Sequence, residues 1–530
     1  MPLSDAFRIP VTVVTAVLIS LAALLGACSP EGPNGQKSRN EGASGSQSNR
    51  HGNSRSTTGQ GSSGKDRKQQ SLPALVPIAH LTAKQESVSM EELSGGKNLV
   101  VPQKYAGTAK QLLGGSGFQT LGSVDEVLDL VSSTPDAMGM VPWDEVGPRV
   151  KAMGVGDQSL LEPGQTVEDY PLASDGVTEP DSGELRRVVV GGDIVLDRGQ
   201  YYTVFVQGLG PDFPLDGGYA AVTGRTPEPS DYSETGITHE FTAERRGGAG
   251  EVRKYLSSAD LTLANFENPV VRNSVYHPDA TTFTGDLRLM PELDQAGIDG
   301  VTLGNNHILD AGTSGLRETI RHLDEASISH AGAGTNLDEA RKPMIFDLGG
   351  TKIGVLSYHG VPSYEWTWAA QSYPGTAPLQ EKVMREDVTR LRKQVDLVMV
   401  MPHWGLEYIA TPEPEQVEFA HAAVDAGADI LIGGHAHWPK GIEMYRGVPV
   451  YYGVGNFLLD QSWSEETSTG IFADITLYGD RVIQTQPIPF IMLDRAQPNI
   501  LVPGAGGNRA LRKVYLASLG PEFRAYKSRD

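Results

Sequence analysis

Between residues 185 and 493, short apolar runs rich in valine, isoleucine and leucine alternate with longer stretches of helical periodicity. Each run is too short for a helix, and each ends in a cluster of polar residues. Strands that alternate with helices in this way are typical of a sheet with parallel strands. We therefore predict an α/β domain over residues 185–493, in which the polar clusters gather at the carboxyl ends of the strands.

Five of these runs end in residue types that bind metals. They span residues 188–190, 260–264, 300–303, 396–401 and 429–432. The side chains that follow them are Asp193, then Asn265 and Glu267, then Asn306 and His307, then His403, and finally His435 and His437. Imidazoles, carboxylates and an amide that all stand at strand ends predict a metal site at this edge of the sheet.

The first two clusters supply carboxylates. Asp193 follows two glycines, which let the backbone approach a metal or ligand closely, and its oxygens suit a hard cation. Glu267 is a candidate metal ligand, with a turn cap as the alternative. Arg198 lies five residues after Asp193 and could hold an anionic group, although such a residue more often forms a surface ion pair.

The last three clusters supply imidazoles. Asn306 beside His307 pairs a possible ligand with a possible proton donor, because the pKa of histidine lies near neutrality. His435 and His437 are one residue apart after a strand, so they can point to two adjacent metals. Glu407 follows His403 and either orients an imidazole or is exposed.

At these motifs the chain resembles the CapA family of capsule and poly-γ-glutamate biosynthesis proteins. The resemblance runs from about residue 188 to residue 460. It is carried by Gly192-Asp193, Ala264-Asn-Phe-Glu267, Asn305-Asn-His307 with Asp310 and Gly312, His403-Trp-Gly with Glu407-Tyr408, Gly427-Ala-Asp429, Gly434-His-Ala-His437 and Gly455-Asn456-Phe457. It implies a calcineurin-like metallophosphoesterase fold, in which a β-sheet sandwich is flanked by helices.

The same resemblance implies a centre with two divalent metal ions, and Mn, Fe and Zn all suit a mixed imidazole and carboxylate site. The implied ligands are Asp193 and His437 for one ion, Asn306, His403 and His435 for the other, and Glu267 between them. His307 would be the general acid. Further contacts to the ligands or to substrate would come from Arg198, Asn265, Asp310, Glu407, Tyr408 and Asn456. Two ions about 4 Å apart would activate a hydroxide and neutralise charge on a phosphoryl or carbonyl oxygen.

Three positions differ from the family's pattern. Ile194 and Val195 follow Asp193, where phosphoesterases usually place a histidine two residues on. Thr284 stands where the family has an arginine, which removes a possible anion-binding cation. Gly434 stands where relatives often have a histidine. These differences bear on substrate binding and turnover rather than on the fold.

The N-terminus predicts export. An apolar run over residues 11–25 leads into Gly26-Ala27-Cys28, which contains the only cysteine of the chain. The run is short for a membrane span, so we predict a signal peptide over residues 1–28 and a lipid anchor on Cys28, with an ordinary signal peptide as the alternative. One cysteine cannot form an intramolecular disulfide. The predicted location is extracytoplasmic, with the protein anchored to the cell membrane as a lipoprotein.

Four further segments complete the predicted organisation. Residues 29–71 are rich in Gly and Ser and predict a disordered stalk. Residues 72–167 mix strand and helix patterns and predict a small α/β domain of unknown role, faintly similar to a lobe of a periplasmic solute-binding protein. Residues 168–184 are predicted as a linker and residues 494–530 as a C-terminal tail, which from about Val502 is either a tail or a surface helix.

A formal net charge of −21 and a pI near 5.0 oppose general binding to nucleic acid, because the two surfaces would repel. An anionic polymer or phosphoester substrate would therefore need a local cationic site. We expect a role in synthesis or export of capsule or poly-γ-glutamate, with a metal-dependent hydrolase centre. The alternatives are a surface metallophosphoesterase unrelated to capsule, and a non-catalytic polymer-binding member of a synthase or export complex.

Overall fold

The computed structural model describes residues 72–83, 85–96, 98–115, 117–163, 170–173, 177–226, 240–278, 280–504 and 507–518. The predicted signal peptide, Cys28 and the predicted stalk lie outside these residues. Within the described residues, no helix combines the length and the apolar character that crossing a bilayer requires.

The first part of the described chain forms a five-stranded sheet in the order β5-β4-β6-β2-β7. Its strands are β2 (Leu75–His80), β4 (Leu99–Pro102), β5 (Gln119–Leu121), β6 (Met138–Pro142) and β7 (Val150–Ala152). Its helices are α1 (Met90–Ser94), α2 (Ala106–Leu113) and α3 (Val124–Ser133). Ser89 and Ser123 cap α1 and α3 by accepting a backbone N–H in the first turn. This part of the chain therefore combines a sheet with helices, while its standing as a separate domain, its limits and its role stay predictions.

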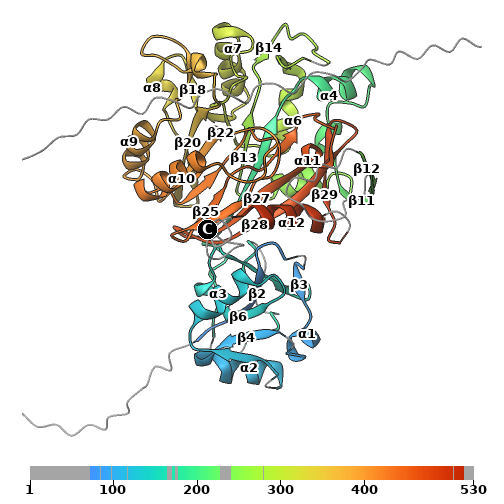
Figure 1. Cartoon of the computed structure of the whole chain (residues 1–530), viewed down its shortest axis with the longest axis vertical. Helices are drawn as coiled ribbons and strands as arrows, with labels where there is room; N and C mark the ends of the chain where they lie inside the picture. The colour runs from blue at the N-terminus through green and yellow to red at the C-terminus, as the bar shows by residue number, and fades with distance from the viewer. Residues whose placement is uncertain are drawn as a thin grey trace, which may run out of the picture. The chain divides into compact units, whose positions relative to one another are not determined.

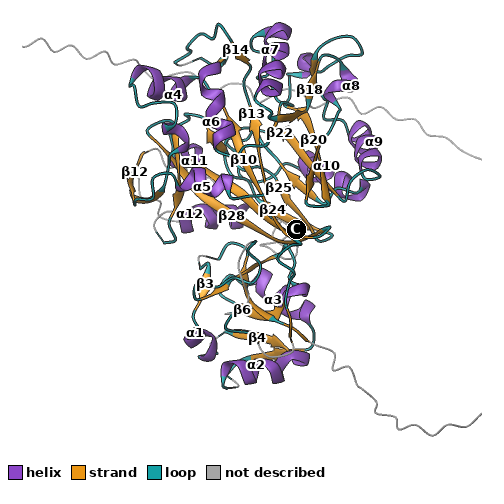
Figure 2. Cartoon of the chain, turned by 180° about the vertical axis from the view of Figure 1, so that it is seen from behind, coloured by secondary structure: helices purple, strands orange, loops and turns teal. Residues whose placement is uncertain are grey.

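The main domain holds two large sheets (Figures 1 and 2). The order of the ten-stranded sheet is β12-β11-β29-β28-β27-β10-β13-β16-β17, with β26 also paired to β10. Its strands are β10 (Leu185–Ile194), β11 (Tyr219–Thr226), β12 (Glu240–Arg245), β13 (Leu261–Phe266), β16 (Gly300–Thr302), β17 (Ser329–Ala331), β26 (Asn456–Leu458), β27 (Thr469–Tyr478), β28 (Arg481–Leu493) and β29 (Gln497–Leu501). Strands β10, β13, β16 and β17 pair in parallel.

The six-stranded sheet has the order β19-β20-β22-β23-β25-β24. Its strands are β19 (Met344–Leu348), β20 (Thr351–Gly360), β22 (Leu397–Trp404), β23 (Ile430–Ile432), β24 (Ile442–Tyr445) and β25 (Val448–Tyr451). Strands β20, β22, β23 and β25 pair in parallel, so their carboxyl ends lie at one edge.

Three apolar layers hold the main domain together. Val188 and Val190 of β10 belong to a buried cluster that includes residues of β20, β22 and β23, so this layer lies between the two sheets. Val189 points the other way and packs with α5 (Glu251–Ser257), α6 (Met290–Gln295) and α7 (Gly312–Glu325). Because both faces of β10 are buried, its sequence reads as one apolar run without alternation.

The third layer covers the outer face of the six-stranded sheet. Residues of α9 (Glu381–Leu391) and α10 (Pro414–Ala426) pack there against β20, β22 and β23, and both views show these helices beside β20. Helix α10 begins at Pro414 after a capping box on Glu413 and ends at Gly427, whose φ of 113° suits glycine. The layers confirm the predicted fold class, a β-sheet sandwich flanked by helices.

The C-terminal segment differs from the predicted tail. Strand β29 pairs with both β28 and β11, and α12 (Gly507–Ala517) buries Val514 completely. The strand is difficult to recognise in the sequence because it is short and contains Pro498. The segment from residue 494 therefore contributes a strand to the ten-stranded sheet, and its basic residues include Arg509, which is buried against Glu465 and Glu466.

Candidate metal centre

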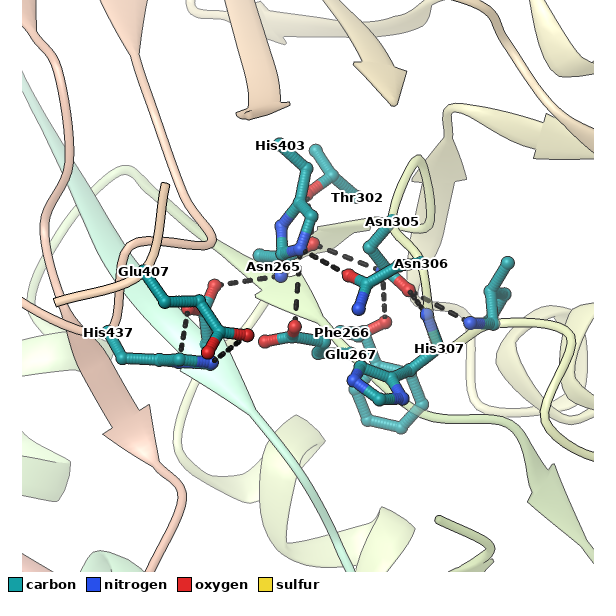
Figure 3. A network of polar contacts seen from close by, with 12 residues as sticks. Asn265, Phe266, Glu267, Thr302, Asn305, Asn306, His307, His403, Glu407 and His437 are labelled. Carbon is teal, nitrogen blue, oxygen red and sulfur yellow. Dashed lines mark hydrogen bonds and ion pairs between the residues drawn. The ribbon is translucent and has the colours of Figure 1, made fainter. Parts of the chain in front are cut away.

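The five polar clusters converge where the carboxyl ends of the parallel strands meet (Figure 3). Asp193 is the penultimate residue of β10, Glu267 follows β13, and His403 is the penultimate residue of β22. Close packing near Asp193 requires a glycine before it, because a Cβ on Gly192 would lie 1.8 Å from the carbonyl oxygen of Gly455. The structure thus brings together residues that the sequence separates by more than two hundred positions.

Asn265 is the hydrogen-bonding hub of the centre. Its Nδ2 donates to Asp193 Oδ1 at 2.8 Å and lies 3.1 Å from His403 Nδ1. Its Oδ1 accepts from Thr302 Oγ1 and Asn305 Nδ2, each at 3.2 Å. The amide is therefore fixed in one orientation, and it holds two predicted metal ligands in place.

Glu267 is a buried carboxylate without a hydrogen-bond donor. It is 1% exposed, and neither Oε1 nor Oε2 accepts a hydrogen bond from the described residues. Its Oε1 lies 3.2 Å from His403 Nε2, which is 2.9 Å from Asn306 Oδ1. Burial and the charge of Asp193 raise the pKa of Glu267 well above its usual range. A divalent cation would supply the partner that this carboxylate lacks.

Two groups of donor atoms meet at Glu267. The donor atoms of Asp193, Glu267 and His403 all lie within 4.8 Å of one another, and the same holds for Glu267, His435 and His437. The chemistry of both groups suits a divalent metal ion, and Glu267 belongs to both groups. The grouping places His403 near Asp193 and His435 near His437, whereas the family pattern pairs Asp193 with His437, so the division of ligands between the ions stays a prediction.

The imidazoles at the centre differ in charge. Burial lowers the pKa of His403 to about 3 and that of His435 well below its usual value, so both are neutral, which is the form that binds metals. Burial also lowers the pKa of His437, but its hydrogen bond with Asp193 and the charge of Glu267 outweigh burial and raise it to about 9. A bound metal would compete with the proton of His437.

His437 is oriented for binding through Nε2. Its Nδ1 lies 2.9 Å from Asn456 Oδ1, and the Nδ2 of that asparagine donates to the carbonyl of Thr467 at 2.9 Å. Asn456 must therefore accept from His437 Nδ1–H, which leaves Nε2 toward the centre. Both His435 and His437 have left-handed backbone, with φ values of 83° and 57°, a strain that is common at functional sites.

Gly434 packs closely against two predicted ligands. A Cβ built at this position would lie 3.1 Å from Asp193 Oδ1 and 3.2 Å from His403 Nδ1, so a larger side chain would crowd both groups. The departure from the family's histidine thus accompanies close packing of the backbone on Asp193 and His403.

His307 stands at the rim and is set up to hold a proton. Its Nδ1 is 2.8 Å from Asp310 Oδ2, which also accepts the backbone N–H of Phe283 at 2.9 Å. The ring of Phe283 packs on that of His307 with centroids 4.5 Å apart. Asp310 thus fixes the Nδ1–H tautomer and leaves Nε2 available to substrate, as a general acid requires.

The remaining predicted residues surround these ligands. Glu407 is 3.9 Å from His437 Nε2, and the ring of Tyr408 is 5.8 Å from that of His437. Arg198 pairs with Asp460 at 2.7 Å, and its guanidinium carbon lies 6.0 Å from the centre of the Phe283 ring. Arg198 therefore forms an ion pair, which is the alternative expected from the sequence. The ring of Phe283, which packs on His307, separates Arg198 from that histidine.

Sequence reasoning missed one histidine of this edge. His359 is the penultimate residue of β20 and is the register partner of His403 on β22. Its side chain is completely buried, and burial lowers its pKa well below the usual value. Residues 353–358 are an apolar run like the other five, so the strand-end rule alone could have found it.

The chain is similar to proteins that are named for PGA biosynthesis, capsule biosynthesis and polyglutamine synthesis. The chain is 27% identical over 267 residues to PGA biosynthesis protein CapA of Bacillus subtilis, covering 46% of this chain and 69% of that one. It is 28% identical to capsule biosynthesis protein CapA of Bacillus anthracis, covering 42% of this chain and about half, 55%, of that one. It is 30% identical over 306 residues to a "probable polyglutamine synthesis accessory protein" of Mycobacterium tuberculosis, covering 52% and 74%.

Solved structures with related architecture are similar at low sequence identity. NAD nucleotidase of Haemophilus influenzae matches with a TM-score of 0.35 and 12% identity, over 62% of this chain and 55% of that one. The 5'-nucleotidase of Candida albicans matches with a TM-score of 0.33 and 10% identity, over 62% and 57%.

A family model described as bacterial capsule synthesis protein PGA_cap matches residues 187–461, slightly more than half of the chain. The match contains every predicted metal ligand and the predicted general acid. The resemblance to CapA proteins is thereby confirmed, and the chain belongs to the PGA_cap family of bacterial capsule synthesis proteins.

Proposed function

We propose that this protein takes part in the synthesis or export of an anionic surface polymer, capsule or poly-γ-glutamate, and that it carries a hydrolase centre with two divalent metals. The relatives named for capsule and polyglutamate synthesis support the biological role. The observation that carries the chemical part is Glu267, which is buried without a hydrogen-bond donor between two groups of histidine and carboxylate ligands.

The proposed reaction is hydrolysis of a phosphoester or of a γ-glutamyl amide. Two Mn, Fe or Zn ions, when bound, would activate water and neutralise the charge that develops on the attacked group. The residues that would hold them are Asp193, Glu267, Asn306, His403, His435 and His437. Their donor atoms are buried and preorganised by Asn265 and Asn456, so little rearrangement is needed on binding.

The chain's own acid is His307. Asp310 lies against Nδ1 and orients the ring, so Nε2 is the atom that would pass a proton to the leaving group. Phe283 covers one face of the ring and limits its rotation. Hydrolysis requires an oriented proton donor, whereas binding of a polymer does not. We therefore regard this arrangement as the feature that favours turnover over passive binding.

We further propose an extracytoplasmic location, with the protein tethered to the membrane by lipid on Cys28 and associated there with a polymer synthase or export complex. The sequence of the N-terminus supports this placement. Mass spectrometry of the protein from its native membrane would find a lipid-modified N-terminal cysteine. Release of Cys28→Ala into the soluble fraction is the expected consequence.

Elemental analysis of the purified full-length protein tests the centre. We expect close to two divalent ions per chain in the wild type and in His307→Ala, and clear loss in His435→Ala, because only the last variant removes a ligand. Wild-type protein that holds no metal after incubation with Mn, Fe or Zn would contradict the proposal.

The same His307→Ala variant separates catalysis from binding. Loss of surface polymer in cells that carry this variant, with metal content unchanged, would support a hydrolase. Normal polymer in such cells would show that the protein assists the pathway without turnover, which is the polymer-binding alternative.

A further inference from the structure

The row of histidines at the edge of the six-stranded sheet has a member that belongs to none of the sequence motifs. His359, His403 and Gly434 stand at the ends of the neighbouring strands β20, β22 and β23, and His435 follows Gly434. His359 and His403 are register partners on parallel strands, so their side chains leave the same face of the sheet. Their ring centroids are 6.4 Å apart.

Hydrogen bonds on one side of the His359 ring determine its tautomer. Nδ1 lies 2.9 Å from Thr367 Oγ1, which donates its only proton to the carbonyl of Tyr364 at 2.8 Å. Nδ1 also lies 3.3 Å from Thr376 Oγ1, which donates to the carbonyl of Thr367 at 3.3 Å. When both hydroxyl protons lie on these carbonyls, both hydroxyl oxygens face His359 as acceptors and Nδ1 carries the hydrogen.

The other ring nitrogen is then a lone-pair donor without a partner. Nε2 of His359 is buried and makes no hydrogen bond with the described residues. The same property, a buried polar atom with no hydrogen bond, marks Asp193 Oδ2, both oxygens of Glu267 and His435 Nδ1. Burying such atoms costs free energy unless something supplies a partner. His359 shares this feature with the predicted metal ligands, but His330 Nδ1 on β17 has it too, so the place of His359 beside His403 carries the inference.

The rest of the segment fixes the ring in place. The backbone N–H of His359 donates to the carbonyl of Ala377 at 2.8 Å, and Trp368 Nε1 donates to the carbonyl of His359 at 3.0 Å. Thr367, which holds Nδ1, is itself completely buried. A ring nitrogen that donates to an oxygen while its partner nitrogen stays free is the arrangement of metal-binding histidines.

The geometry points to His359 as an additional imidazole of the metal centre, which stabilises the ion on the His403 side through the lone pair of Nε2. This inference rests on the proposed two-metal centre and adds to it a residue outside the family motifs. His359 lies outside the two groups of donor atoms that already meet within 4.8 Å, so it acts from the flank of the His403 group.

Metal affinity of the full-length protein is the test. We expect His359→Ala to bind one of the two Mn²⁺ ions at least about tenfold more weakly in calorimetric titration, with the other ion little affected. Thr367→Val keeps the imidazole and removes the hydroxyl that holds Nδ1, so a smaller loss of affinity for the same ion is expected. His330→Ala, which removes a histidine paired with Asp324 on another strand, is the matched control and should bind both ions normally.

The outcomes separate this inference from the proposed function. A wild type that binds no metal would overturn both. Two ions bound with unchanged affinity in His359→Ala would overturn only the role of His359, even if that variant had a raised KM. Nitrogen NMR of the metal-free protein supplies a readout that does not depend on activity: we expect an unprotonated Nε2 on His359 that shifts on addition of Zn²⁺, and a protonated Nε2 would contradict the inference.

Discussion

Two buried charged clusters in the main domain are built in opposite ways. At one, Arg187 of β10 donates to both oxygens of Asp474 on β27 at 2.7 to 3.1 Å, and its guanidinium lies 4.3 Å from the centre of the Tyr255 ring. At the other, neither oxygen of Glu267 accepts a hydrogen bond from the described residues. Both clusters touch β10, yet only one is balanced by the protein itself.

This contrast separates structural from functional charge. A buried ion pair with complete hydrogen bonding has no net charge. Removal of one partner leaves the other charge buried and uncompensated, which lowers the stability of the fold. A buried carboxylate without a partner is already unfavourable, so the protein holds it only because the surrounding sheets fix it or because a ligand completes it. The two clusters should therefore respond in opposite directions when a carboxylate is neutralised.

The largest effect is expected at the unpaired cluster. Glu267→Gln removes the only carboxylate that belongs to both ligand groups, so metal affinity should fall about a hundredfold or more for both ions. The metal-free variant should unfold at the same temperature as metal-free wild type or higher, because the amide has the shape of the carboxyl and cannot ionise in this buried site. Elemental analysis and thermal unfolding in chelator measure both quantities, and a strongly destabilised metal-free variant would contradict the comparison.

The paired cluster should show the reverse. Asp474→Asn removes the carboxylate that pairs with Arg187. The side chain of Arg187 is only 18% exposed, so its charge stays largely buried. We expect a loss of about 3–5 kcal/mol in the free energy of unfolding, which is the usual cost of breaking a buried pair. Metal content should stay at the wild-type level. Urea unfolding followed by circular dichroism tests the first expectation, and a loss below about 1 kcal/mol would show that water already solvates the pair.

The same contrast explains what the sequence could predict. Val188 to Val190 and the other apolar runs are buried on both faces, so the fold class follows from their composition alone. Asp193, Glu267, His403 and His435 were found because each follows such a run, and the structure brings their side chains together. The pairing of Arg187 with Asp474 was invisible, because it joins strands nearly three hundred residues apart and involves no motif.

Other features could not be predicted for different reasons. The grouping of His403 with Asp193 depends on the angle between two sheets, which no local pattern encodes. Strand β29 is five residues long and contains a proline, so its sequence alone does not predict a strand. His359 could not be predicted from a polar cluster, because its strand ends in Tyr358-His359-Gly360, where the histidine has no polar neighbour with metal-binding character.

A pH dependence should distinguish the clusters further. The pKa of His437 is raised from its usual 6.5 to about 9 in the metal-free fold, so folded protein binds this proton more tightly than unfolded protein. The stability that results is fully present below pH 6.5 and is lost as pH rises through about 9. We expect metal-free wild type to lose about 2–3 kcal/mol over this range.

His437→Gln should flatten most of that slope, because it removes the group that titrates. Metal affinity of the wild type should rise over the same range, since the ion competes with the proton of His437. Unfolding at several pH values in chelator measures the slope, and an equal slope in His437→Gln would assign the titration to another group.

The smallest effect tests whether a local cation compensates for the acidic surface. Arg198 and Arg495 both pair with Asp460, at 2.7 and 2.8 Å, but only Arg198 also lies against Phe283, which covers His307. If Arg198 assists the capture of an anion, Arg198→Gln should weaken binding of inorganic phosphate to the metal-loaded protein about tenfold, or about 1.4 kcal/mol. Arg495→Gln removes an equivalent partner of Asp460 and should leave phosphate affinity unchanged. Equal weakening in both variants would mean that the charge of Asp460 matters and that neither arginine contacts the ligand.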